Sequence, residues 1–127
     1  MSVSRFFLVA GALATALGVA LGAYSAHAAK DAAHPEAARL LQTAVQYQLI
    51  HGIGILVVGL VARWGSSPWL VASGALLLSG VVLFCGSLWV LALTTHSLGP
   101  AAPLGGIAFI AGWLALVIHA AVVRTPR

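Results

Sequence analysis

The chain has 127 residues, of which 61% are hydrophobic and only 6% charged, and its mean hydropathy is +1.07. A soluble domain carries about 25% charged residues, so these few charges exclude a globule with a water-facing surface. The net charge of +4 comes from six scattered basic residues and not from a basic run, which argues against nucleic-acid binding and for the lipid bilayer as the partner.

Four apolar segments are long enough to cross a bilayer, which takes about 20 residues in helical form. They cover approximately residues 6–28, 44–63, 69–95 and 104–123. We therefore predict an all-α fold, an integral membrane four-helix bundle with up-down topology. The spans leave no room for a soluble domain, so residues 1–127 are expected to form a single membrane domain.

The first segment, residues 6–28, has features of both a signal peptide and a membrane span. Residues 26–28 resemble a cleavage site, but the apolar run exceeds the about 7–15 residues of a signal peptide. We therefore expect the segment to remain as the first span. Gly18 and Gly22 form a G-x-x-x-G pattern on its small-residue face, which predicts close packing against another helix.

Residues 35–46 have an amphipathic pattern that leads into the second span. Pro35 suits the first helical position, and Glu36 suits the positive end of the helix dipole. Polar and apolar residues then occupy opposite sides of a helix. We predict an interfacial extension before a span that starts at about residue 44.

Tyr47, Gln48 and His51 are the densest group of polar side chains that enters an apolar span. Polar groups in a membrane are costly and are candidates for function. One interpretation is that His51 bonds Ser87, Tyr47 or a backbone carbonyl and joins two helices. The alternative is that the three side chains line a polar pocket, open to the outer face, that binds or transports a small molecule or an ion.

Small residues recur at helical spacing in the last two spans as well. The third span carries Ser73, Gly80, Ser87 and Thr94, and one face of the fourth carries Gly105, Ala108, Gly112, Ala115 and His119. Such seams let helices approach closely in lipid. The residues predicted to pack helices together are therefore Gly18, Gly22, Gly80, Ser87, Gly105 and Gly112.

His27 and His96 are predicted at the same outer edge as His51, which makes His27 a further candidate for the polar cluster. Three histidines at one level could hold a metal, and two could ligate a haem. The sequence has no C-x-x-C-H motif and no carboxylate beside these histidines, so we predict no cofactor and keep a metal or haem protein as a third hypothesis. No catalytic set of residues is found, which argues against an enzyme.

Basic residues predict the orientation of the chain. Four of them, Arg5, Arg63, Arg124 and Arg127, lie at the termini and in the second loop, whereas Lys30 and Arg39 lie on the other side. Cytoplasmic segments are the ones richer in Lys and Arg. Both termini are therefore predicted to be cytoplasmic.

Several short motifs carry a family resemblance. They are GAYSAH at residues 22–27, Tyr47-Gln48 with His51, GSLW at residues 86–89, PLGG at residues 103–106, and Gly112-Trp113. With these motifs the chain resembles the YgdD family of small bacterial inner-membrane proteins, which is related to animal transmembrane protein 256. Trp89 stands where many relatives have Tyr. The resemblance implies a four-span inner-membrane protein and supplies no reaction. We expect a structural or interaction protein that packs against a second copy or a larger membrane complex.

Overall fold

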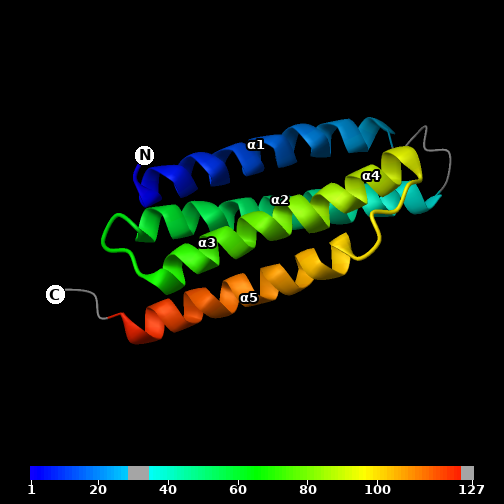
Figure 1. The fold of residues 1–127 in the computed structure, drawn as a ribbon. Coiled ribbons are helices and arrows are strands. Elements are labelled where there is room, and N and C mark those ends of the chain that lie inside the picture. Colours follow the sequence, from blue (N-terminus) through cyan, green and yellow to red (C-terminus); the bar gives the residue numbers. More distant parts are fainter. Residues whose placement is uncertain (29–34, 124–127) are drawn as a thin grey trace.

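The computed structural model describes residues 1–28 and 35–123, and all regular secondary structure in these two ranges is helical. The helices are α1 (Val3–Ala28), α2 (Pro35–Val61), α3 (Pro68–Gly80), the π-helical turn η1 (Val81–Cys85), α4 (Gly86–Thr94) and α5 (Ala101–Val122). α3, η1 and α4 follow one another without a break and form one rod (Figure 1). With this rod counted once, the described residues contain four helices long and apolar enough to cross a membrane, which confirms the predicted all-α four-helix bundle.

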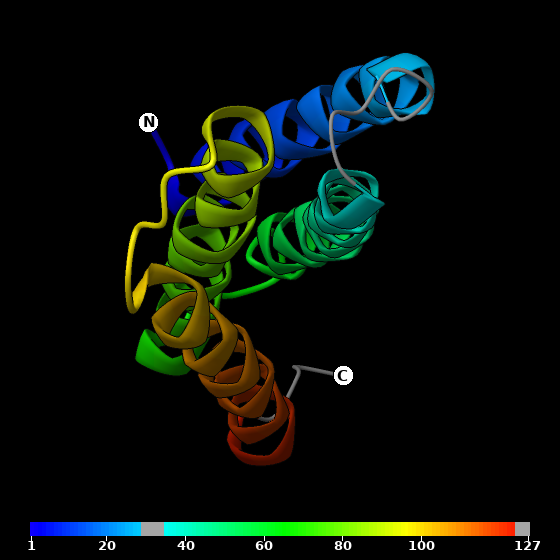
Figure 2. The same ribbon diagram turned by 90° about the vertical axis from the view of Figure 1, so that its right-hand side faces the viewer.

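The four spans alternate in direction, so the beginning of α1 and the end of α5 lie at the same end of the molecule (Figure 1). α1 packs mainly along α2, and α5 packs along α3 and η1. α2 joins these two groups, because it also contacts α3, η1 and α4. Viewed along the helices, α1 and α5 stand at opposite edges of the bundle (Figure 2). α2 and the α3–α4 rod are therefore the two central spans.

α2 is one continuous helix whose first turns already belong to the bundle. Leu41 is 2% exposed and Ala44 is fully buried, while the polar side chains between them face outward. The helix can enter the bundle this early because one of its faces is apolar from its first turns. The apolar helix that could cross a membrane covers Glu36–Val61, and the start of the span near residue 44, after an interfacial extension, stays a prediction.

The third span differs from the regular helix that its pattern suggests. The predicted seam consists of Ser73, Gly80, Ser87 and Thr94. The prediction was wrong at its last member, because Thr94 is exposed, whereas Trp89 and Ala92 are buried. Thr94 is exposed because it is the last residue of α4, where the chain leaves the helix at the left-handed Thr95. Earlier in the same span, the π turn η1 closes i→i+5 bonds and holds about one residue more than an α turn.

Glycines bring α1 and α2 into backbone contact. A Cβ atom on Gly11 would lie 2.5 Å from the backbone N of Leu56, and one on Gly59 would lie 2.6 Å from the backbone N of Leu8. No side chain larger than hydrogen fits such a gap. These two contacts explain why α1, which has few buried side chains, can still pack firmly against α2.

The glycines predicted to pack helices lie against a neighbouring helix, four of them against large side chains. Gly18 meets Leu49, Gly22 meets Val45, Gly80 meets Phe109 and Gly112 meets Leu77, whereas Gly105 lies closest to the backbone N of Phe84. Ser87, the other residue of this set, is 6% exposed. Small residues on one helix thus make room for leucines and aromatic rings on the next, which is how helices gain van der Waals contact where no water drives them together.

Candidate functional site

Gln48 connects three helices from a buried position. Its side chain is 5% exposed, and its Nε2 donates to the backbone O of Ala14 in α1 at 3.1 Å. Its Oε1 accepts from Nε1 of Trp89 in α4 at 3.3 Å. Only this orientation of the amide gives both bonds a donor and an acceptor, since the indole nitrogen can only donate and the carbonyl can only accept. The Gln48 side chain therefore stabilises the contacts of α2 with both α1 and α4.

His51 lies one turn further along α2 and is 6% exposed. Its Nδ1 lies 2.7 Å from the backbone O of Tyr47, so in the neutral ring this nitrogen carries the proton. The ring stacks on Phe109 of α5, with 3.5 Å between the ring centroids and an interplanar angle of 16°. His51 thus joins α2 to α5 through an aromatic contact, while its hydrogen bond stays within α2.

Tyr47 completes a cluster of four rings with His51, Phe84 and Phe109, which we call the aromatic cluster. The centroid of Tyr47 lies 4.7 Å from that of Phe84, 5.7 Å from that of His51 and 6.1 Å from that of Phe109. Phe84 belongs to η1, so the π turn presents this ring to α2 and α5. Tyr47 is 39% exposed and forms the outer edge of the cluster.

Two other residues of the predicted cluster lie apart from His51. Ser87 donates its hydroxyl to the backbone O of Phe84 at 2.8 Å, so it bonds within its own span and not to His51. His27 is exposed near the end of α1. The expectation that these two side chains join the polar cluster was therefore wrong, because a serine side chain is satisfied by its own helix and His27 faces outward.

The histidines expected at one edge do not converge on a metal site. His96 is exposed, and its Nδ1 lies 2.9 Å from the backbone O of Thr94. Within residues 1–28 and 35–123, no group of three or more His, Cys, Asp or Glu side chains is placed to hold a metal ion. The geometry therefore gives the metal hypothesis no ligand set in this part of the chain.

His119 takes part in a second polar contact, at the opposite end of the bundle. Its Nδ1 lies 2.7 Å from Oγ of Ser67, and the same Oγ accepts from the backbone N of Leu70 as the N-cap of α3. The Ser67 hydroxyl can both accept the bond from Leu70 and share one with His119, so it connects the start of α3 to α5. The sequence suggested that His119 faces a helix contact, and the bond to the start of α3 confirms it.

Sequence reasoning missed Trp89 as the partner of Gln48 and Phe109 as the partner of His51. A tryptophan in an apolar span carries an N–H that needs an acceptor, and that requirement was the available signal for the first pair. No comparable signal existed for Phe109, because a phenylalanine in an apolar helix has no polar group that requires a partner.

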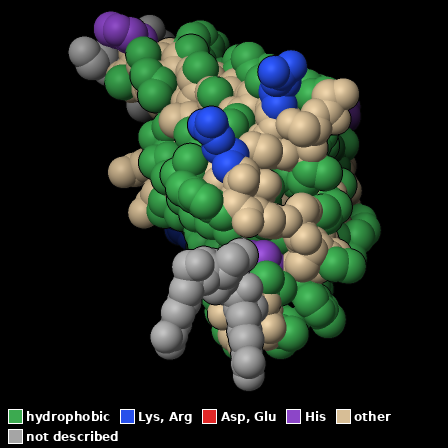
Figure 3. Space-filling model, turned by 90° about the vertical axis from the view of Figure 1, so that its left-hand side faces the viewer, with side chains coloured by type: hydrophobic (Ala, Val, Ile, Leu, Met, Phe, Trp, Pro, Cys, Tyr) green, Lys and Arg blue, Asp and Glu red, His purple; other side chains and the backbone are tan. Residues whose placement is uncertain are grey.

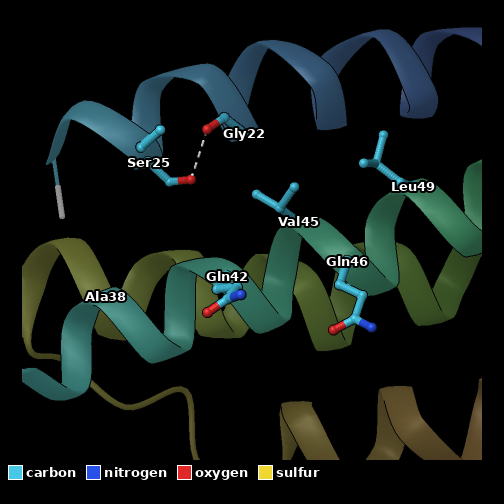
Figure 4. Close-up of a pocket in the computed structure, with 8 residues that line it drawn as sticks. Gly22, Ser25, Ala38, Gln42, Val45, Gln46 and Leu49 are labelled. Atoms are coloured by element: carbon cyan, nitrogen blue, oxygen red, sulfur yellow. Dashed lines mark hydrogen bonds between the residues drawn. The ribbon is translucent and has the colours of Figure 1, made fainter.

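The bundle has an open groove, but it lies away from Tyr47, Gln48 and His51. A hollow of about 640 Å³ separates the end of α1 from the beginning of α2, lined by Gly22, Ser25, Ala26, Ala38, Gln42, Val45, Gln46 and Leu49. Val45 and Leu49 point from α2 toward α1, whereas Gln42 and Gln46 turn away from it (Figure 4). Tyr47, Gln48 and His51 do not line this groove.

The chain is similar to bacterial membrane proteins over most of its length. Residues 21–106 match the family described as "Protein of unknown function (DUF423)". The chain is 40% identical to the UPF0382 membrane protein SH2409 of Staphylococcus haemolyticus, over 90% of this chain and 93% of that protein. It is 36% identical to YwdK of Bacillus subtilis, a UPF0382 membrane protein (91% and 96% covered), and 36% identical to YgdD of Escherichia coli, a UPF0382 inner membrane protein (92% and 90% covered). No solved structure matches the chain.

Proposed function

The chain belongs to the DUF423 family of membrane proteins of unknown function, and from that premise we propose that it serves as a structural or interaction protein within the bacterial inner membrane. The relationship to YgdD confirms the resemblance seen in the motifs. Since no reaction is attached to the family, support for a role has to come from the geometry of the bundle.

One observation carries the proposal: the two buried polar side chains of the second span, Gln48 and His51, both contact neighbouring helices. Gln48 bonds α1 and α4 with both ends of its amide, and His51 lies face to face with Phe109. A binding pocket would leave such groups free to meet a ligand. The arrangement therefore favours the joining of helices over the binding or transport of a small molecule.

We infer further that the protein is not an enzyme. In the described part of the chain the only carboxylate is that of Glu36, which is exposed at the beginning of α2. His51 has an aromatic ring on one face and its Nδ1 bonded to a backbone carbonyl, with no acid to orient it as a base. These surroundings of His51 are typical of a packed contact between helices and not of a catalytic base.

The same role implies partners within the membrane, either a second copy or a larger complex. The outward faces of α1 and α5 are apolar, so lipid or another apolar helix would cover them. The orientation that we propose has both termini in the cytoplasm, because the termini and the loop between α2 and α3 carry four basic residues and the other side carries two.

The substitution His51→Leu tests the proposal. It should lower the thermal stability of the purified protein in detergent, because it removes the stacking on Phe109 and the bond to Tyr47. We expect a cost of about 1–2 kcal/mol, from one aromatic pair and one hydrogen bond. The control His96→Leu should change stability little, because the His96 side chain is exposed and bonds only its own loop.

The opposite result would support a pocket. A His51→Leu protein with unchanged stability, from which a bound small molecule has disappeared, would reject the structural role. Absorbance and elemental analysis of the same samples test the third hypothesis, a metal or haem protein. A haem band or a stoichiometric metal in the unmodified protein would support that hypothesis and would reject a purely structural role.

A further inference from the structure

A second hollow, of about 320 Å³, lies where α1 begins and α2 ends, and two arginines line it. Its walls are formed by Ser2, Ser4, Arg5, Leu8 and Arg63, which we call the arginine notch. We propose that the arginine notch binds the phosphate group of an anionic phospholipid. This inference is independent of the structural role proposed above, since neither arginine takes part in the contacts of Gln48 and His51.

The fold holds the two sides of the notch together. Gly59 of α2 lies so close to the backbone N of Leu8 in α1 that a Cβ atom there would be 2.6 Å away. The hydroxyl of Ser4 donates to the backbone O of Gly59 at 2.9 Å, directly beside this contact. The backbone N of Arg63 bonds the O of Leu60 at 3.1 Å, which keeps the end of α2 in a tight turn. The guanidinium group of Arg5 in α1 and that of Arg63 in the turn after α2 thus line one hollow.

No carboxylate of the described residues neutralises these two charges. The chain has only two acidic residues, Asp31 and Glu36. Glu36 lies in the first turn of α2, about 40 Å from Arg63 at a rise of about 1.5 Å per residue. Asp31 lies outside the described residues, in the connection between the other ends of α1 and α2. Figure 3 shows basic side chains close together on this end of the molecule and no acidic one. Two neighbouring cations without an acidic partner among residues 1–28 and 35–123 favour an external anion.

The position of the notch favours a lipid over a dissolved anion. Trp64 and Trp69 flank the turn after α2 and are 69% and 46% exposed, as expected for side chains at the membrane–water interface. Phospholipid phosphates lie at that level. A guanidinium group can donate two parallel hydrogen bonds to two oxygens of one phosphate. Leu8 adds an apolar side chain to the lining of the notch. The notch is therefore suited to a ligand with a phosphodiester at one end and an acyl chain at the other.

Lipid competition on the full-length protein tests the inference. The protein is equilibrated in detergent with equimolar phosphatidylglycerol and phosphatidylcholine, and native mass spectrometry measures the ratio of the two lipid adducts. The unmodified protein should prefer phosphatidylglycerol. The double variant Arg5→Gln, Arg63→Gln should lose that preference by about fivefold for each guanidinium removed. Equal adducts of the two lipids on the unmodified protein would overturn the proposal.

Arg39→Gln is the control for each single variant, Arg5→Gln and Arg63→Gln, because it also removes one positive charge, at the opposite end of the bundle from an exposed position on α2. It should keep the preference of the unmodified protein. A loss as large as that of either single variant, Arg5→Gln or Arg63→Gln, would show attraction to the overall positive charge and would overturn a localised site.

Two further measurements do not depend on the variants folding. Added sodium chloride should reduce the preference of the unmodified protein, since paired charges at an interface are screened by salt, and a salt-independent preference would contradict the proposal. Inorganic phosphate, added in the same molar amount as phosphatidylglycerol, should leave the lipid adducts unchanged. Full displacement of the lipid by inorganic phosphate would assign the notch to small dissolved anions instead.

Discussion

Polar side chains in this bundle behave differently according to their length. Short hydroxyl side chains mostly bond their own helix, as Thr15 does with the O of Gly11 at 2.8 Å and Ser79 with the O of Ala75 at 2.8 Å. The long amide of Gln48 instead reaches two other helices. A hydroxyl can therefore sit in a span without marking a site, whereas a buried amide has to be matched to partners from elsewhere in the fold.

The first prediction concerns the bond between Gln48 and Trp89. Gln48→Leu should destabilise the protein by about 1–3 kcal/mol, because it removes two interhelical bonds and leaves the buried indole N–H of Trp89 unpaired. Trp89→Phe should cost less in the Gln48→Leu background than in the unmodified protein. A double-mutant cycle on thermal or chemical unfolding in detergent measures this coupling.

Gln46→Leu serves as the control for this cycle, because Gln46 is an exposed glutamine of the same helix. Its stability should stay within about 0.5 kcal/mol of the unmodified protein. Strictly additive effects of the Gln48 and Trp89 substitutions would mean that the two side chains do not interact.

At the scale of elements, close contact between α1 and α2 depends on individual glycines. Gly11→Ala should cost about 1–3 kcal/mol, because its Cβ would meet the backbone of Leu56 at 2.5 Å and neither helix can move aside without losing contacts. Gly86→Ala should be neutral or gain up to about 1 kcal/mol, because nothing lies within 4 Å of its Cβ and alanine favours a helix. Unfolding of the two variants in one detergent makes the comparison, and equal effects would contradict it.

The π turn η1 leads to a second prediction at this scale. Because η1 holds about one residue more than an α turn, deletion of Val82, which is 65% exposed, should convert it to a regular turn and keep Trp89 facing the bundle. Deletion of the exposed Ala75 in α3 should instead rotate the helix by about 100° on one side of the cut.

Expression level and unfolding temperature should therefore fall much further for the Ala75 deletion than for the Val82 deletion. Similar loss in both variants would mean that the extra residue of η1 is required for packing, through the contact of Phe84 with Gly105 and the aromatic cluster.

The sequence predicted the number and type of elements well, because hydropathy and length alone decide which segments cross a bilayer. It did not indicate the π turn inside the third span, because a run of apolar residues such as Val81–Cys85 carries no signal for one. It placed Gln48 and His51 on the buried face but could not supply their partners. Trp89 and Phe109 lie on other helices, and which side chains meet there depends on the register that η1 and the glycines set.

At the scale of the whole molecule, the bundle is two helix pairs joined through their inner members. α1 with α2, and α5 with the α3–α4 rod, form the two pairs, and α2 contacts the rod. α1 and α5 stand at opposite edges and present apolar side chains outward (Figure 2). The edges are therefore the surfaces available to lipid or to a partner, while the polar contacts hold the two inner spans and their neighbours in register.

The orientation of the molecule supplies the last prediction. With both termini in the cytoplasm, a fluorescent protein fused to the C-terminus should fold and fluoresce, and alkaline phosphatase fused there should be inactive. Phosphatase inserted in the loop between α4 and α5 should be active, because one span, α5, separates this loop from the cytoplasmic C-terminus.

The charge bias that sets the orientation is four basic residues on the cytoplasmic side against two on the other. The pair Arg5→Gln, Arg63→Gln reduces it to two against two and should yield a mixture of orientations. The pair Arg5→Lys, Arg63→Lys keeps the charge and should keep the orientation. A uniformly periplasmic C-terminus in the unmodified protein would reverse the proposed topology and would place the arginine notch in the outer leaflet.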